Sequence, residues 1–312
     1  MLKQFIAVIF CFFFITAAIT NVTAQTTYKY AERDTTSLHM DIYDPVGESN
    51  HCCIVFVFGG GFIGGTRDHK SNVSYAKMLI DKGYTVACID YRLGLKGKKL
   101  NKVNIIHELD LAIEMAAEDL LDATLFLIQN AAKFDIDTSK IVLCGSSAGA
   151  ITVLQADYEL SNRSEMAKNI PEGFRYGGVM AFSGAIYSHN GLVKYKNAPA
   201  PTLLLHGIDD KLVPYKFIRL GNLGFFGSNS LAKRFKKYGY PYYIRRYETL
   251  GHEVAMIMNH EIELCDQFIH QFVFEKKQKQ IDATIFDSEI KQERRWHDLK
   301  SRDLRKAAKS SR

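Results

Sequence analysis

Short apolar runs alternate with segments of helical periodicity along most of the chain. The runs are rich in β-branched and aromatic residues, which is typical of buried strands. The segments between them place apolar residues three and four positions apart, which predicts amphipathic helices. Expected strands span residues 53–58, 85–89, 140–144, 176–182, 201–205 and 242–247, and expected helices span 71–82, 104–132 (as one helix or two), 148–158, 230–238 and 260–274.

Buried strands that alternate with helices indicate an α/β protein, with a mostly parallel central sheet and helices on both of its faces. Residues 28–43 precede this pattern and are expected to add one or two antiparallel strands at an edge. No repeat or low-complexity linker interrupts the pattern, so residues 25–274 are expected to form one domain. Reactive groups in such a sheet gather at the carboxyl ends of the strands.

The two ends of the chain differ in character from this domain. A lysine at position 3, an apolar run over residues 5–19 and a small residue at Ala24 predict a signal peptide over residues 1–24, and hence an exported protein. That run is shorter than the roughly 20 residues that a membrane span needs, so no stable span is expected once the signal is removed. Residues 275–312 are expected to form a basic tail that is helical or disordered.

Composition and charge narrow the functional classes. With 47% hydrophobic and 24% charged residues, the chain is neither disordered nor collagen-like. The formal net charge is +6, but residues 275–312 contribute 12 Lys and Arg against 7 Asp and Glu. Because the basicity belongs to the tail, it does not predict a nucleic-acid partner. Six cysteines occur without a C-x-x-C pair, and those of the domain are expected to be buried free thiols.

The sequence Gly145-Ser-Ser-Ala-Gly149 matches G-x-S-x-G between an expected strand and an expected helix. In that context the motif forms a strained turn that lifts a serine hydroxyl above the sheet edge. Ser147 lies midway between the two glycines and is therefore the expected nucleophile, with Ser146 as its neighbour.

A run of glycines, Gly59 to Gly61, follows the first strong strand. Acyl transfer needs N–H donors aimed at the developing oxyanion, and glycines let the backbone approach it closely. Gly60 and Gly61, together with the N–H of Ala148, are the expected oxyanion donors.

An acid and a base follow the nucleophile in the order that such a triad takes on this kind of sheet. Asp210, just past the strand 201–205, is the expected acid, and Asp209 is the alternative. His252, on a glycine-flanked loop after the strand 242–247, is the expected general base. His206 lies closer to its strand end and is interpreted as structural.

These motifs together resemble the α/β-hydrolases, and most of all the carboxylesterase branch with hormone-sensitive-lipase-like and feruloyl-esterase-like enzymes. Asp90-Tyr91-Arg92-Leu93 adds to the likeness, which covers about residues 43–274. The resemblance implies a sheet of about eight strands. It also implies ester hydrolysis without a cofactor or metal, and the roles given above to Ser147, Asp210 and His252.

The expected reaction is hydrolysis of a small-molecule or carbohydrate-linked ester through an acyl-enzyme, with short-chain or aromatic esters favoured over long-chain lipids. Two positions depart from the family pattern: Phe58 replaces a common histidine, and Ala150 replaces a common glycine. Phe58 leaves open whether the oxyanion loop is held in the usual way.

Other classes remain open at this point. The glycines at 59, 61 and 64, with Asp90 at the end of the next strand, also match a dinucleotide-binding fingerprint. That interpretation leaves Ser147, Asp210 and His252 without a role. A non-catalytic binding protein with the same fold is a further alternative.

Overall fold

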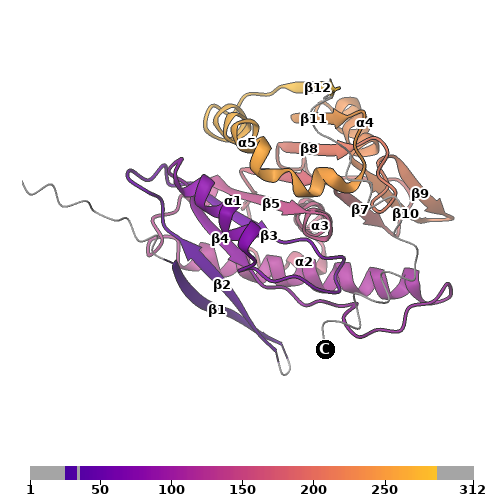
Figure 1. Cartoon of the computed structure of the whole chain (residues 1–312), viewed down its shortest axis with the longest axis horizontal. Helices are drawn as coiled ribbons and strands as arrows, with labels where there is room; N and C mark the ends of the chain where they lie inside the picture. The colour runs from indigo at the N-terminus through magenta and orange to yellow at the C-terminus, as the bar shows by residue number, and fades with distance from the viewer. Residues whose placement is uncertain (1–24, 34–35, 287–312) are drawn as a thin grey trace, which may run out of the picture.

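The computed structural model describes residues 25–33 and 36–286. Nine strands form one twisted sheet in the order β1-β2-β4-β3-β5-β6-β8-β11-β12 (Figure 1). β1 and β2 pair antiparallel at one edge, and β2 is antiparallel to β4, whereas the strands from β4 to β12 all run parallel. The strands of this sheet are β1 Gln25–Arg33, β2 Thr36–Tyr43, β3 Cys53–Val57, β4 Thr85–Ile89, β5 Ile141–Ser146, β6 Gly178–Phe182, β8 Thr202–Gly207, β11 Tyr242–Tyr247 and β12 Gln280–Ile285.

Helices cover both faces of the sheet. Lys82 and Tyr84, just after α1, bond to Asp266 of α5, so these two helices share one face. α2 and α3 pack on each other, and α3 packs against β3, β5 and β6. The helices are α1 Lys70–Ile80, α2 Ile105–Gln129, α3 Ala148–Asn162, α4 Ser228–Tyr238 and α5 Ile262–Phe268, with shorter turns η1 Thr138–Lys140, η2 Glu165–Ala167, η3 His252–Met256, η4 Met258–Glu261 and the π-helical η5 Ile269–Phe274.

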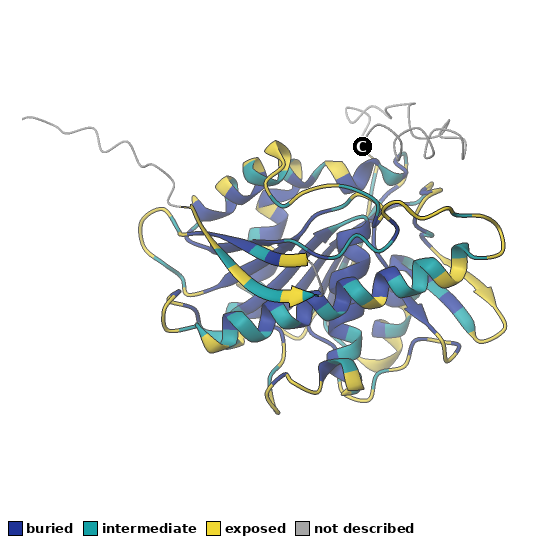
Figure 2. Ribbon diagram, turned by 90° about the horizontal axis from the view of Figure 1, so that it is seen from below, coloured by how far each residue is buried: buried dark blue, intermediate teal, exposed yellow. Residues whose placement is uncertain are grey.

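The apolar runs of the sequence form the core. Every residue of β3, β4, β6 and β8 is buried, because helices cover these central strands on both sides (Figure 2). All five cysteines of the described chain are buried free thiols, as expected. None of the described helices is both long enough and apolar enough to cross a bilayer.

One strand at the edge of the sheet corrects the sequence analysis. Residues 280–285 were expected within a helical or disordered tail, and this is wrong: they form β12, which pairs parallel to β11. Residues 281, 283 and 285 alternate with exposed ones, a strand pattern that the surrounding charges concealed. The expected signal peptide and residues 287–312 lie outside the described residues.

A second sheet of three strands, which the sequence analysis did not predict, stands beside the main one. Its strands are β7 Ala185–Ser188, β9 Phe217–Leu220 and β10 Leu223–Gly227, in the order β7-β10-β9. It joins the chain after β6 to the chain after β8, and β10 leads directly into α4. The expected single or double helix over 104–132 is the one long helix α2.

Candidate active site

Ser147 lies on a sharp turn between β5 and α3. Its φ of 53° and ψ of −118° are strained for a residue with a side chain, and its N–H donates to the Phe182 carbonyl at 2.8 Å. Gly149 allows this turn to pack: a Cβ there would lie 2.0 Å from the Val57 carbonyl oxygen. The motif therefore has the strained strand-to-helix geometry that the sequence predicted for it.

Ser147, His252 and Asp210 are far apart in the sequence, and the fold brings their side chains into one hydrogen-bonded chain. Ser147 Oγ lies 2.8 Å from His252 Nε2, and His252 Nδ1 lies 2.9 Å from Asp210 Oδ2. Ser147 follows β5, Asp210 follows β8, and His252 begins η3 after β11, so all three come from the carboxyl edge of the sheet. Such a chain can move a proton from the hydroxyl to the imidazole while the carboxylate holds the ring.

Asp210 is buried, and four hydrogen-bond donors surround its carboxylate. Oδ1 accepts the N–H groups of Leu212 at 2.8 Å and Val213 at 2.9 Å, and Oδ2 faces both His252 and His206. Burial opposes ionisation, but the hydrogen bonds from the two histidines outweigh it and hold the pKa of Asp210 below its usual range. The alternative acid, Asp209, is exposed.

His206 is buried beside the acid, a contact that the sequence analysis did not foresee. Its Nε2 lies 3.3 Å from Asp210 Oδ2 and 3.3 Å from the Val213 carbonyl, and its Nδ1 lies 2.8 Å from Ser228 Oγ. Because both groups near Nε2 are acceptors, Nε2 carries the proton and Nδ1 accepts from Ser228. The only sequence signal was a histidine four residues before Asp210, at the end of the same strand.

The loop that carries His252 has its own internal support. The Gly251 N–H donates to Glu253 Oε2 at 2.7 Å, and the Glu253 side chain is buried. The neighbouring Leu250 and Gly251 carbonyls approach Gly207 so closely that a Cβ there would meet them at 2.2–2.3 Å. The base is therefore carried by a segment that is packed against the end of β8.

The glycine loop after β3 lies against the nucleophile turn. A Cβ on Gly59 would lie 2.9 Å from the Ser146 carbonyl oxygen and 3.2 Å from the Ser147 Cβ. Gly60 and Gly61 both have positive φ, at 133° and 63°, and Ala148 is the first residue of α3. All three expected oxyanion donors thus belong to segments that meet at the nucleophile.

Phe58, which the sequence analysis noted as a departure from the family pattern, anchors this loop. Its ring packs on Tyr91 with centroids 4.6 Å apart, and the Tyr91 hydroxyl donates to the Phe58 carbonyl at 2.9 Å. A Cβ on Gly65 would touch the same ring, so Phe58 is enclosed and only 3% exposed. The loop is held by aromatic packing and one buried hydrogen bond instead of an imidazole.

The residues of the dinucleotide fingerprint are used differently. Asp90, the expected ribose acceptor, is hydrogen-bonded within the protein to Arg67 Nη1 at 2.7 Å and to the His39 N–H at 3.3 Å. The glycine loop does not open a helix, because α1 begins only at Lys70. These contacts do not fit the nucleotide-binding arrangement.

Among the described residues, one group brings three metal-ligand side chains within 4.8 Å of one another: Asp110, Glu114 and His189. Asp110 Oδ1 and His189 Nε2 lie 3.0 Å apart and bond to each other. Glu114 and His189 are exposed, so this group is accounted for by a surface ion pair.

Comparison with known proteins gives one family match. The BD-FAE family model, which describes an α/β-hydrolase-type esterase family, matches residues 40–186. No curated protein sequence matches the chain significantly.

The chain is similar to structures of esterase 2 from Thermogutta terrifontis. The apo form is 20% identical with a TM-score of 0.59, the propionate-bound form 18% identical with 0.60, and the form phosphorylated by paraoxon 19% identical with 0.58. Each match covers 80% of this chain and 95% of the other. The chain has the α/β-hydrolase fold. The family match supports an esterase function.

Proposed function

We propose that the chain is a serine carboxylesterase that hydrolyses small esters through an acyl-enzyme. The observation that carries this proposal is the unbroken hydrogen-bonded chain from Ser147 through His252 to Asp210. Each neighbouring pair lies within 3 Å, which is the reach that proton transfer between a nucleophile and a base requires.

The mechanism follows from the positions of these groups. His252 accepts the proton of Ser147 as the hydroxyl oxygen attacks the ester carbonyl, and ionised Asp210 stabilises the imidazolium. The N–H groups of Gly60, Gly61 and Ala148 stabilise the oxyanion. The imidazolium then protonates the leaving alcohol, and His252 next activates the water that releases the acid.

Short acyl groups on accessible alcohols, such as carbohydrate-linked or aromatic esters, are the substrate class that we propose. The similar esterase from Thermogutta terrifontis has been obtained with propionate and with butyrate bound, which supports a small acyl site. We also propose export through residues 1–24. N-terminal sequencing of the secreted protein should then begin at Gln25.

The proposal is tested with p-nitrophenyl acetate, butyrate and decanoate on three proteins: the wild type, Ser147→Ala and Ser146→Ala. Loss of the nucleophile should lower kcat on the order of 10⁶-fold, whereas the neighbouring substitution should leave activity within a few-fold of the wild type. Acetate and butyrate should be hydrolysed faster than decanoate.

A second experiment separates an enzyme from a binding protein of the same fold. Paraoxon should form a covalent adduct on Ser147, detected by mass spectrometry of the labelled peptide, as the phosphorylated form of the Thermogutta terrifontis esterase suggests. Absence of any adduct, together with unchanged turnover in Ser147→Ala, would refute the assignment.

A further inference from the structure

Charge is divided unevenly within the folded domain, although its total is close to neutral. Residues 211–247 contain nine Lys and Arg and no Asp or Glu. Arg245 pairs with Glu261 and Arg246 with Asp282. Within the described part of the chain the other seven form no ion pair; they are Lys211, Lys216, Arg219, Lys233, Arg234, Lys236 and Lys237.

Four of these basic residues line an apolar groove between α4 and the second sheet. Arg219 comes from β9, while Lys233, Arg234 and Lys237 lie three and four positions apart on one face of α4. Among the residues that the structure describes, no acidic side chain lines the groove. Its apolar residues are Leu192, Val193, Phe217, Phe226 and Leu231.

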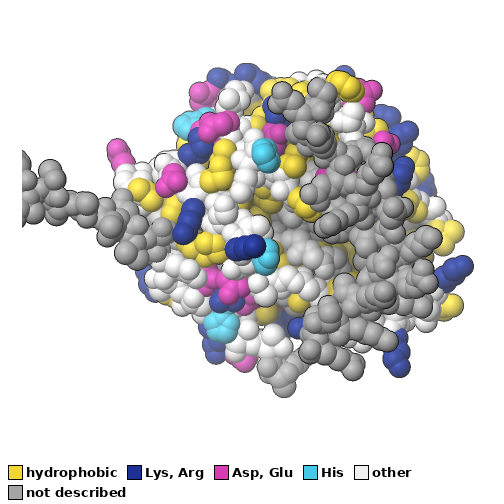
Figure 3. Space-filling view, viewed as in Figure 1, with side chains coloured by type: hydrophobic (Ala, Val, Ile, Leu, Met, Phe, Trp, Pro, Cys, Tyr) yellow, Lys and Arg dark blue, Asp and Glu magenta, His cyan; other side chains and the backbone are white. Residues whose placement is uncertain are grey.

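The hairpin of β9 and β10 adds exposed apolar side chains beside this groove. All four residues of β9 are exposed, and Phe217, Ile218 and Leu220 are 58%, 67% and 69% accessible. Bulky apolar side chains that are exposed together typically mark a site that binds a protein, a membrane or a ligand. In Figure 3, hydrophobic side chains lie at the right-hand edge, where Figure 1 places β9 and β10, and basic side chains lie above them, on the side of α4.

We propose that this surface, β9, β10 and α4, docks the protein on a lipid bilayer that contains anionic lipids. Basic residues attract the headgroups, and apolar residues at the hairpin enter the boundary of the acyl chains. This proposal does not depend on the esterase function.

Charge argues against a second copy of the chain as the occupant. Two copies joined through this surface would bring the basic residues of both against each other, and none of the described residues that line the groove is acidic. The exposed Ile218 and Leu220 argue against a purely polar polyanion, because such a ligand would leave them in water.

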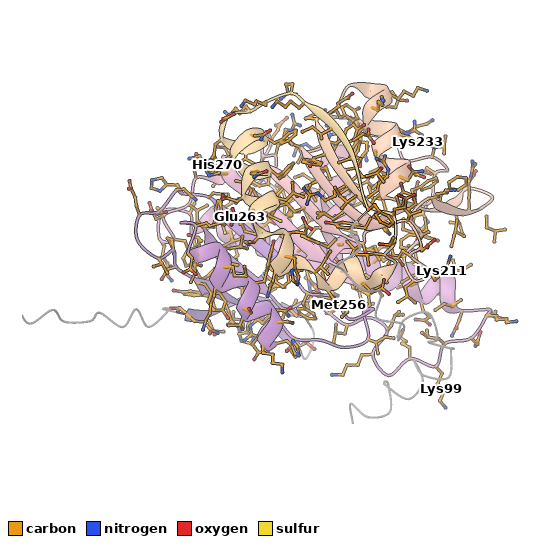
Figure 4. All side chains as sticks on the ribbon, turned by 45° about the horizontal axis from the view of Figure 1, so that its top comes forward. Lys99, Lys211, Lys233, Met256, Glu263 and His270 are labelled. Atoms are coloured by element: carbon orange, nitrogen blue, oxygen red, sulfur yellow. The ribbon has the colours of Figure 1, made fainter. Side chains whose placement is uncertain are left out.

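Docking would also bring the catalytic edge toward the lipid. Asp210 lies in the segment between β8 and β9, and Leu212, two residues later, is exposed. Met256, at the end of the turn that carries His252, is 57% exposed. Figure 4 shows Lys211 and Lys233 on the same side of the molecule.

The test measures co-sedimentation of the full chain with vesicles of phosphatidylcholine, and with vesicles in which phosphatidylglycerol replaces about a third of the lipid. The wild type should bind the second and not the first. Replacing Lys233, Arg234 and Lys237 by Ala should weaken binding on the order of 100-fold, from about fivefold for each charge. Ile218→Ser with Leu220→Ser should also weaken binding, and Phe217 is left in place because it stacks on Phe226.

The matched control replaces Lys70, Lys77 and Lys133 by Ala, which removes the same number of charges. Lys70 and Lys77 are exposed on α1, which Figure 1 places on the opposite side of the molecule from β9 and β10, and Lys133 is exposed just after α2. This control should bind the vesicles as the wild type does. All variants should keep the wild-type circular dichroism spectrum and the wild-type rate on a soluble ester.

Four results would overturn the proposal. In the first, the control loses as much vesicle binding as the α4 variant. In the second, the α4 variant binds vesicles like the wild type. Either result would assign the attraction for anionic lipid to other basic residues. A dimer that Ile218→Ser and Leu220→Ser dissociate would assign the surface to a second copy. Binding to heparin that ignores the hairpin substitutions, without vesicle binding, would assign it to a polyanion.

Discussion

Ser147 follows β5 and Asp210 follows β8, and the fold holds these two residues by different means. Ser147 is positioned by the backbone: its own φ is strained at 53°, and the close packing at Gly149 leaves no room for a Cβ. Around Asp210 side-chain and backbone donors surround one carboxylate. Activity should therefore be sensitive to atoms added to the segments around Ser147, and to loss of the negative charge at Asp210.

Removing the charge of the acid should give the largest effect of those that test this comparison. Asp210→Asn keeps the shape of the side chain, but it removes the carboxylate that orients and stabilises His252, so kcat should fall about 10⁴-fold. Steady-state kinetics on a p-nitrophenyl ester measure this. Asp209→Asn, at the exposed neighbouring position, is the control and should change kcat little; a larger loss there would transfer the role of the acid to Asp209.

Adding one methyl group to the glycine loop tests the other half of the comparison, the close packing around Ser147. In Gly60→Ala the Cβ would lie 1.9 Å from the Gly64 carbonyl oxygen, at a φ of 133°. The loop must shift, and misplaced oxyanion donors should lower kcat by about 10²–10³-fold.

Gly64→Ala is the matched control for that variant, because no atom lies within 4 Å of its Cβ. Its kcat should stay close to that of the wild type. Equal activity of the two variants would show that the loop is not held as tightly as these contacts indicate.

His206 offers a smaller test of the acid side. It is a positioning residue: it contacts Asp210 and no reacting atom. His206→Phe removes the donor and should lower kcat about tenfold with KM unchanged, since one hydrogen bond to a charged group contributes about 1.5–3 kcal/mol. His206→Gln keeps an N–H donor and should restore part of the rate. A rise in KM without a change in kcat would contradict this role.

Asp157 is a second buried carboxylate, and its contrast with Asp210 can be tested by measuring the stability of the protein instead of its activity. Burial outweighs its hydrogen bond from the Ala200 N–H and the attraction of Arg175, and raises the pKa of Asp157 to about 7. Asp210 is also buried, but two histidine donors shift its pKa in the opposite direction.

The folded state therefore holds a proton on Asp157 that the unfolded chain releases near pH 4, and this contribution to stability is lost as the pH rises toward 7. Asp157→Asn cannot ionise, so its stability relative to the wild type should increase by about 1–3 kcal/mol between pH 5 and pH 8. Thermal unfolding at both pH values measures this. A constant difference between the two proteins would contradict it, and activity should not change.

Local patterns were sufficient for most of the fold. β4 has the predicted limits, because a short apolar run that ends at a polar residue identifies a buried strand by itself. β11 also has the predicted limits, although two arginines interrupt its apolar residues. β7 and β10 were missed because β7 has only four residues and β10 contains two glycines. β9 and β12 were missed because each lies at the edge of its sheet, with all residues exposed in β9 and alternating exposed residues in β12. Edge strands bury one face at most, so their hydrophobic signal is weak.

The candidate site also contains residues that the sequence predicted and residues that it missed. Ser147, Asp210 and His252 could be predicted because each follows a recognisable strand, and chain order suggested their roles. His206 could not be assigned a partner, since nothing in its neighbourhood in the sequence says that its ring faces Asp210. The seven basic residues without ion pairs were hidden in a near-neutral total, because a sum of charges carries no positions.

The sequence by itself determined the alternation of strands and helices, the strained serine turn and the edge of the sheet where reactive groups would gather. These depend on periodicity and on residues next to one another in the chain, which act locally. Only the tertiary structure decided which side chains meet: Ser147 with His252, Asp210 with His206, and the basic face of α4 with the exposed hairpin. Such contacts depend on how distant segments pack, which local propensities do not specify.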